Sequence, residues 1–211
     1  MLARIRLKVP DRPGSLGRVA SAIGAASGDI AGVDVLDNEA GQALDDVVVQ
    51  VRDTSHLTRV LDGLAAVPGV EVVGVHHPAP PVPGHADLQL VAQVLARPDR
   101  SLQTLVDGAP VALGVDWAAI LHADDEGLSA VAASPDAPAG LPAVNGALRL
   151  RAVQIPVPDG PSHPGVLVPL EGCPLGLVLG RAGLEFHSRE IWRLGQLGGV
   201  VGPCLAVPAP A

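Results

Sequence analysis

The segment from Asp11 to Val19 holds the residues whose types and spacing best suit a small-molecule site. Pro13 presets the backbone for the start of a helix, and Gly14 lets the chain pass close to a bound molecule. The amides of Gly14, Ser15 and Leu16 would open that helix, where amides lack partners and the helix dipole is positive. We therefore expect a carboxylate to bind there, with about 0.3–1 kcal/mol supplied by the dipole.

A simpler reading of the same segment is that Pro13 and Gly14 only turn the chain, while Asp11 caps its own helix. A separate possibility is chemistry at Cys173, in a Gly-Cys-Pro turn, with His122 or His187 as its base. A reactive thiol needs a base or cationic neighbours, and no second cysteine stands near Cys173 to resolve an oxidised form. We expect no catalytic residue.

Three further groups favour structural roles over chemistry. Asp124-Asp125-Glu126 lacks the spacing of a calcium loop and, before Gly127, is typical of a hairpin turn. His76, His77 and His85 lie in a proline-rich stretch typical of a spacer. Trp117 and Trp192 suit core or interface positions. We expect no metal and no cofactor.

The elements that position the first segment follow from hydrophobic periodicity. Residues 3–9 alternate as a strand, residues 16–23 have helical spacing, and residues 30–36 and 46–52 are strands. A second helix over residues 57–67 is capped by Ser55, and a last strand covers 70–75. Gly28 suits the left-handed residue that closes the first helix. The order βαββαβ predicts a ferredoxin-like sheet with strands one and three as central neighbours.

The second half is expected to be an α+β domain. Residues 88–95 and 102–106 have helical spacing, and strands are expected at 115–121, 128–132, 148–157, 165–170 and 175–179. A closing helix begins near His187 with Glu190 in its first turn. The predicted organisation is a domain at 1–77, a Pro-rich linker at 78–85, a second domain at 86–206 and a tail at 207–211.

Composition excludes several classes of function. The 211 residues carry a net charge of −8 with no Tyr, one Phe and two Trp, which argues against nucleic-acid binding. No apolar run is long enough for a membrane span, no signal peptide opens the chain, and two cysteines give no disulfide framework, so we expect a cytoplasmic protein. Arg4, Arg6, Lys8 and Arg52 are expected to form a basic stripe that pairs with the second domain or a second subunit.

Residues 1 to about 77 resemble the ACT domain, a regulatory module that senses amino acids. The resemblance rests on Asp11-x-Pro13-Gly14-x-Leu16-x-x-Val19, on Gly28-Asp29-Ile30 and on Pro68-Gly69-Val70. It implies a homodimer with an amino acid at the seam, between the first loop of one copy and the second strand of the other.

The resemblance also assigns roles to residues. The ligand carboxylate would meet the amides of Gly14, Ser15 and Leu16, while Asp11, Asp29 and the backbone near Ile30 would meet its ammonium. Many amino-acid-binding members have Asn where Asp29 stands. This departure implies either a preference for neutral or basic amino acids, or a site that no longer binds.

The second half resembles a GAF domain, another small-ligand module. The resemblance rests on residues 166–170, Gly172, residues 175–180 and residues 186–190, and it does not extend to residues 134–157. Together the two resemblances favour a non-catalytic ligand sensor. The alternatives are an assembly subunit that holds a partner enzyme and binds no ligand, and an enzyme centred on Cys173.

Overall fold

The computed structural model describes residues 1–77, 86–125, 127–138, 141, 147–157 and 160–206. It divides into two compact units, Met1–Pro80 and Pro81–Ala211. The predicted linker at 78–85, the tail at 207–211, Glu126 of the acidic turn, and residues 139–140 and 142–146 lie outside the described residues.

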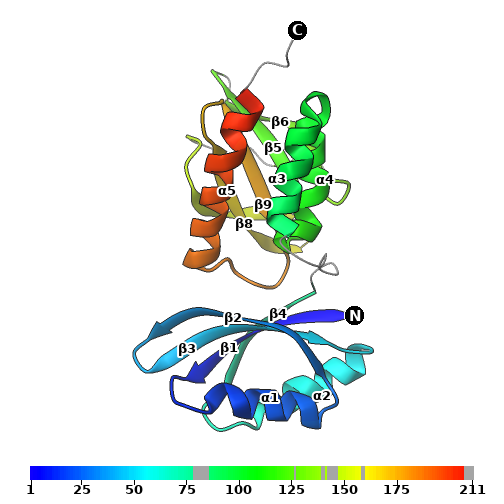
Figure 1. Cartoon of the computed structure of the whole chain (residues 1–211), viewed down its shortest axis with the longest axis vertical. Coiled ribbons are helices and arrows are strands. Elements are labelled where there is room, and N and C mark those ends of the chain that lie inside the picture. Colours follow the sequence, from blue (N-terminus) through cyan, green and yellow to red (C-terminus); the bar gives the residue numbers. More distant parts are fainter. Residues whose placement is uncertain (78–85, 126, 139–140, 142–146, 158–159, 207–211) are drawn as a thin grey trace. The chain divides into compact units, whose positions relative to one another are not determined.

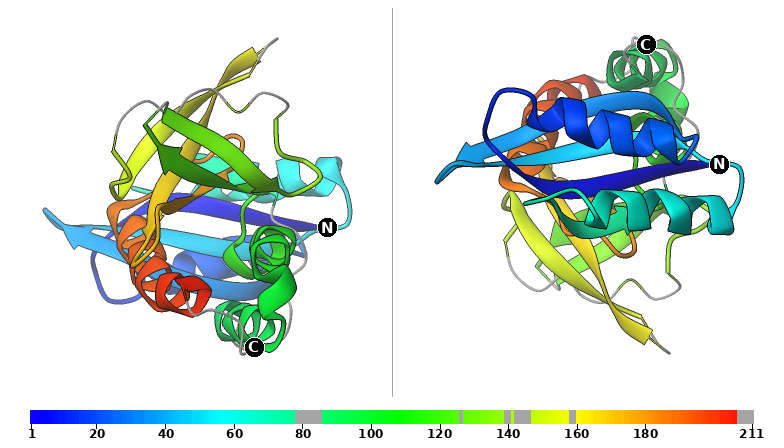
Figure 2. Two further views of the ribbon diagram at one scale, coloured as in Figure 1. Left: turned by 90° about the horizontal axis from the view of Figure 1, so that it is seen from above. Right: turned by 90° about the horizontal axis from the view of Figure 1, so that it is seen from below.

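The first unit has the predicted order of elements. These are β1 (Leu2–Pro10), α1 (Ser15–Ala25), β2 (Asp29–Glu39), β3 (Gln42–Gln50), α2 (Thr54–Ala65) and β4 (Glu71–His76). The antiparallel sheet has the strand order β2-β3-β1-β4, so the expectation of central strands one and three is confirmed. Both helices lie on one face of this sheet (Figures 1 and 2).

The core of the first unit lies between that sheet face and the helices. Alternate residues of β1, namely Ala3, Ile5, Leu7 and Val9, point into it and are buried. Helix residues Val19, Ile23, Val60 and Leu64 pack against them. The period of two in the strand and of three to four in the helices is what the sequence encoded.

The ends of the helices differ from expectation. The residue with a left-handed backbone after α1 is Ser27, at φ 65°, rather than Gly28. Gly28 is required for space, because a Cβ there would lie 2.8 Å from Ile23 Cγ2. The cap of α2 is Asp53, whose carboxylate accepts a hydrogen bond from the His56 amide at 2.7 Å, rather than Ser55.

The second unit is α+β, as predicted. Its elements are α3 (Ala86–Ala96), a short 3-10 turn at Pro98–Arg100, α4 (Ser101–Leu113), β5 (Trp117–Asp124), β6 (Gly127–Ala133), β7 (Arg151–Val157), β8 (Gly160–Leu170), β9 (Leu175–Gly180) and α5 (Ser188–Ala206). The five strands form an antiparallel sheet in the order β6-β5-β9-β8-β7. Helices α3, α4 and α5 share one apolar core with this sheet (Figure 1). A second apolar cluster, built around Trp117, Ile155 and Leu167, includes alternate strand residues.

None of the helices in the described part of the chain combines the length and apolar character that a membrane crossing requires.

Candidate functional site

The bend between β1 and α1 is built as an open start to a helix. Gly14 occupies the position before the first helical residue with φ 85°, a conformation that favours glycine. No side chain caps α1, and its first turn contains no acidic residue. Asp11 therefore does not cap the helix, and that part of the simpler reading is wrong. The positive end of the α1 dipole is left without a neutralising side chain.

The backbone and side-chain groups around this bend differ in whether they already have hydrogen-bond partners. The Ser15 amide donates to the Arg12 carbonyl at 3.1 Å, and the Ser15 hydroxyl accepts from Arg18 Nη2 at 3.0 Å. The Asp11 amide donates to the Gly41 carbonyl at 2.9 Å, which ties the bend to the turn between β2 and β3. Asp11, Pro13, Gly14 and Leu16 are exposed, whereas Ser15 is buried.

Asp29 and Ile30, the other predicted ligand residues, lie far from this bend in the same chain. Asp29 pairs with Gln50, and Gln50 pairs with Leu2, the first residue of β1. Asp11 follows the last residue of β1, so about 25 Å of strand separates the two places. Within one copy of the chain, the bend and Asp29 are therefore too far apart to contact the same small ligand.

The outer edge of β2 is available for pairing. β2 is an edge strand, and within the described residues no strand pairs with its outer side. Val33 and Val35 on this strand are 38% and 50% exposed, and Leu16 on α1 is 41% exposed. If β2 paired antiparallel with β2 of a second copy, the start of each β2 would lie beside the bend of the other copy.

Asp45 is a polar residue near the bend that the sequence reasoning missed. It pairs in register with Leu7 and shares the helix-covered face of β3 with Val47. It is 3% exposed, and its Oδ1 accepts no hydrogen bond from the described residues. Burial, followed by the charges of Asp11 and Asp46, raises the pKa of Asp45.

A signal for Asp45 was present in the sequence. The sequence predicts that this strand begins at Asp46, which places Asp45 in the preceding turn. β3 instead begins at Gln42, and its period of two then places Asp45 on the same side as Val47 and Val49.

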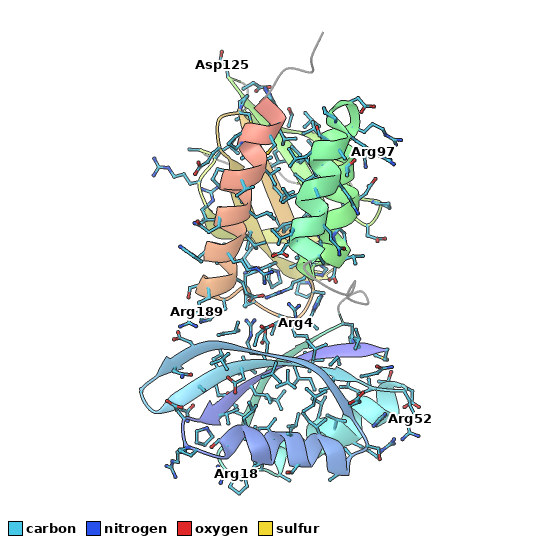
Figure 3. All side chains as sticks on the ribbon, in the orientation of Figure 1. Arg4, Arg18, Arg52, Arg97, Asp125 and Arg189 are labelled. Carbon is cyan, nitrogen blue, oxygen red and sulfur yellow. The ribbon has the colours of Figure 1, made fainter. Side chains whose placement is uncertain are left out.

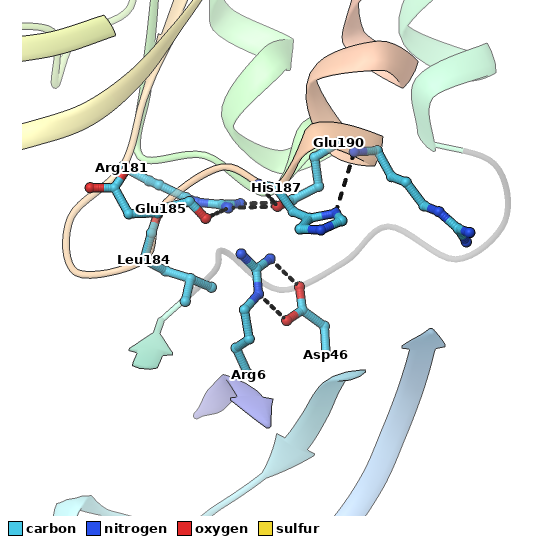
Figure 4. Close-up of polar contacts among 8 residues, drawn as sticks. Arg6, Asp46, Arg181, Leu184, Glu185, His187 and Glu190 are labelled. Atoms are coloured by element: carbon cyan, nitrogen blue, oxygen red, sulfur yellow. Dashed lines mark hydrogen bonds and ion pairs between the residues drawn. The ribbon is translucent and has the colours of Figure 1, made fainter. Parts of the chain in front are cut away.

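Two residues of the predicted basic stripe, Arg6 and Lys8, have ion-pair partners within their own sheet. Arg6 donates to both carboxylate oxygens of Asp46, at 2.7 and 2.8 Å (Figure 4). Lys8 Nζ lies 3.6 Å from Glu71 Oε2. Arg4 lies on the face opposite the helices (Figure 3). Arg52 follows β3, and its backbone amide donates to His56 Nδ1. Arg52 is therefore not part of the stripe, and Arg6 and Lys8 have ion-pair partners in their own sheet.

In the second unit the strongest polar cluster is structural. Arg181 is fully buried and donates to Glu190 at 2.8 and 2.9 Å and to the carbonyls of Leu184 and Glu185 (Figure 4). Glu190 also accepts from the His187 amide at 2.9 Å, which places it in the first turn of α5 as predicted. This cluster holds the segment between β9 and α5.

Among the described residues, Cys173 has a backbone carbonyl as its hydrogen-bond partner, and the candidate base His122 has its Nδ1 3.9 Å from Asp124 Oδ2. Burial raises the pKa of the Cys173 thiol, which donates to the Leu170 carbonyl at 3.2 Å. A raised pKa lowers the thiolate fraction that a nucleophile requires. Trp117 is buried, and Trp192 is 65% exposed on α5. Among the described residues no group of three His, Cys, Asp or Glu side chains could hold a metal ion.

Comparison with known proteins found a family match and several solved structures with some likeness. The family profile of the ACT domain matches residues 1–74. No curated protein sequence matches the chain. Solved structures with similar folds include a GAF domain from Pseudomonas syringae pv. tomato, at 19% identity and a TM-score of 0.40, covering 56% of this chain and 83% of that one.

Two further solved structures show likeness at a similar level. The GAF domain of an Acinetobacter phosphoenolpyruvate-protein phosphotransferase has 14% identity and a TM-score of 0.41, covering 58% of this chain and 94% of that one. A formyltetrahydrofolate deformylase from Pseudomonas putida KT2440 has 14% identity and a TM-score of 0.30, covering 50% of this chain and 39% of that one. At these values no ligand or activity follows for this protein. The family match and the βαββαβ sheet agree over the same residues: residues 1–74 are an ACT domain.

Proposed function

We infer that this protein is a non-catalytic regulator that binds an amino acid between the ACT domains of two copies. The supporting observation is that the open start of α1 and Asp29 lie at opposite ends of the sheet in one chain. In addition, within the described residues no strand pairs with the outer edge of β2. A two-fold pairing through β2 would bring each bend to the partner's Asp29, giving two equivalent sites.

Each residue of the site has a role in this proposal. The ligand carboxylate binds at the amides of Gly14, Ser15 and Leu16, with the Ser15 amide exchanging its bond to the Arg12 carbonyl for one to the ligand. Asp11 of one copy and Asp29 and the Ile30 backbone of the other bind the ammonium. Charge-assisted hydrogen bonds of this kind suit a sensor with Kd of about 10 μM to 1 mM, or roughly −7 to −4 kcal/mol.

An assembly subunit without a ligand is the second candidate. It is favoured by the Ser15 amide and hydroxyl, both of which already have partners within the bend and α1. Such a subunit would hold a partner enzyme through its ACT or second unit. An enzyme centred on Cys173 has least support, because burial raises the pKa of that thiol.

The proposal is tested by thermal unfolding of the full chain with each of the twenty amino acids at millimolar concentration. Because a ligand that binds only the folded dimer stabilises it by mass action, we expect one or a few amino acids to raise the unfolding temperature. Asp11→Asn and Asp29→Asn should each reduce that shift, whereas Asp62→Asn, an exposed control on α2, should leave it unchanged.

No shift with any amino acid would refute the sensor proposal. Retention of a partner enzyme from cell extract, with no shift, would support the assembly subunit instead.

A further inference from the structure

Asp45 is a buried carboxyl that the site as described above does not use. It lies on the helix-covered face of β3, and its Oδ1 accepts no hydrogen bond within the described part of the chain. A buried polar group without a partner costs free energy, and a buried carboxylate costs more. We therefore expect a bound group to pair with Asp45 and offset this cost when the protein performs its function.

The position of Asp45 connects it to the start of α1. It pairs with Leu7 of β1, three residues before β1 ends at Pro10, and the charges of Asp11 and Asp46 help to raise its pKa. The Asp46 carboxylate accepts two hydrogen bonds from Arg6 on the opposite face of the sheet. Asp11 is exposed and gives α1 no cap. Asp45 and Asp11 thus form a pair of interacting carboxyls, and neither of them caps α1.

These two carboxyls suit an organic cation better than a metal ion. A metal ion generally needs three or more protein ligands, and the described residues offer no cluster of three His, Cys, Asp or Glu side chains. An ammonium or guanidinium group is satisfied by one or two carboxylates. The helix start alongside favours a carboxylate in the same molecule.

We propose that Asp45 is a specificity-determining residue that selects amino acids with a cationic side chain. This rests on the proposed function: the ligand carboxylate binds at the start of α1, Asp11 and the partner's Asp29 bind the α-ammonium, and Asp45 binds the side-chain cation. Because Asp45 is covered, the exposed bend at residues 11–14 must shift to admit that side chain.

The test compares L-lysine with L-norleucine, which has the same carbon chain without the terminal amine. Binding to the full-length protein is measured by calorimetry at pH 7.5. We expect lysine to bind at least about tenfold more tightly than norleucine, since a charge-assisted hydrogen bond to a buried carboxylate is lost with the amine. Asp45→Asn should abolish the preference, while Asp62→Asn, an exposed control on α2, should retain it.

Each outcome has one meaning. Equal or tighter binding of norleucine by the wild-type protein would overturn the role of Asp45 and leave the sensor proposal standing. A preference for lysine that survives Asp45→Asn would also overturn it, as would a calcium-induced stabilisation lost in that variant. Binding of neither probe, nor of any other amino acid, would overturn both proposals. The wild-type comparison holds even if Asp45→Asn fails to fold.

Discussion

Pairing of two copies through the outer edge of β2 can be tested by placing a charge at Val33. This side chain lies one residue from the middle of β2 and is 38% exposed. In an antiparallel β2–β2 pairing about a two-fold axis, the two copies of residue 33 would lie near each other. Val33→Lys therefore removes apolar contact twice and adds two like charges at the seam.

The size of the effect follows from the burial that would be lost. A fully buried valine side chain contributes about 1.5–3 kcal/mol, so the exposed third of Val33 contributes about 0.5–1 kcal/mol per copy, or 1–2 per dimer. Repulsion between two nearby surface lysines adds about 1 kcal/mol. At about 1.4 kcal/mol per factor of ten, the dimer Kd should rise roughly 30- to 100-fold.

Sedimentation equilibrium of the full chain measures this Kd directly. Val73→Lys is the matched control, because Val73 is 45% exposed on β4, the opposite edge strand of the same sheet. We expect Val73→Lys to leave the dimer Kd within about twofold of wild type. A wild-type protein that is monomeric at all concentrations, or a dimer equally stable with Val33→Lys, would refute pairing through β2.

Three further predictions concern stability. Asp45→Asn should stabilise the ACT domain at pH 7 by about 1–3 kcal/mol in urea unfolding followed by circular dichroism, with the gain shrinking as pH falls toward 4. The sign follows from the raised pKa of Asp45. Between the unfolded and folded pKa values of this carboxyl the folded state binds more protons, so wild-type stability falls as pH rises through that window. A stability gain in Asp45→Asn that does not depend on pH would contradict this prediction. His56→Ala should cost about 1–3 kcal/mol by the same assay, because His56 is buried and bridges the Ala26 carbonyl at 2.9 Å and the Arg52 amide; an unchanged midpoint would count against this. Glu190→Ala should lower the stability of the second unit by about 3 kcal/mol, because it leaves buried Arg181 without its carboxylate partner. Tryptophan fluorescence reports the unfolding of this unit alone. An unfolding transition that does not shift would show that the ion pair is not required.

The sequence predicted the order and type of the elements in both units. It did so because their core-facing residues repeat with periods of two and of three to four, as in Ala3, Ile5 and Leu7. Local sequence signals predicted the type of each element better than they predicted the residues at which it begins and ends. α4 continues through Pro110 to Leu113, since Leu105, Val106 and Ala109 bury against the sheet and tertiary packing outweighs the proline.

Interactions between distant residues were beyond the sequence. Arg6 pairs with Asp46 only because the register of β1 and β3 sets them opposite each other. Arg181 gains Glu190 only when β9 and α5 meet. That Asp45 Oδ1 accepts no hydrogen bond from the described residues is likewise a property of the packed domain, since no local pattern reveals which atoms of a buried carboxyl lack partners.

The predicted site residues could be named from the sequence, but their separation could not. The sequence placed Asp11 and Asp29 eighteen positions apart and gave no distance between them. The strand register shows that they lie at opposite ends of one sheet. This geometry is why the proposed site requires two chains.

A mixing experiment with two inactive variants tests that requirement most directly. Asp11→Ala and Asp29→Ala chains are each measured for amino-acid binding alone and after dissociation and reassociation as an equimolar mixture. If each site takes its bend from one chain and Asp29 from the other, mixed dimers regain one intact site, and the mixture should recover about a quarter of the wild-type capacity. A mixture as inactive as its two components would contradict a site shared between two chains.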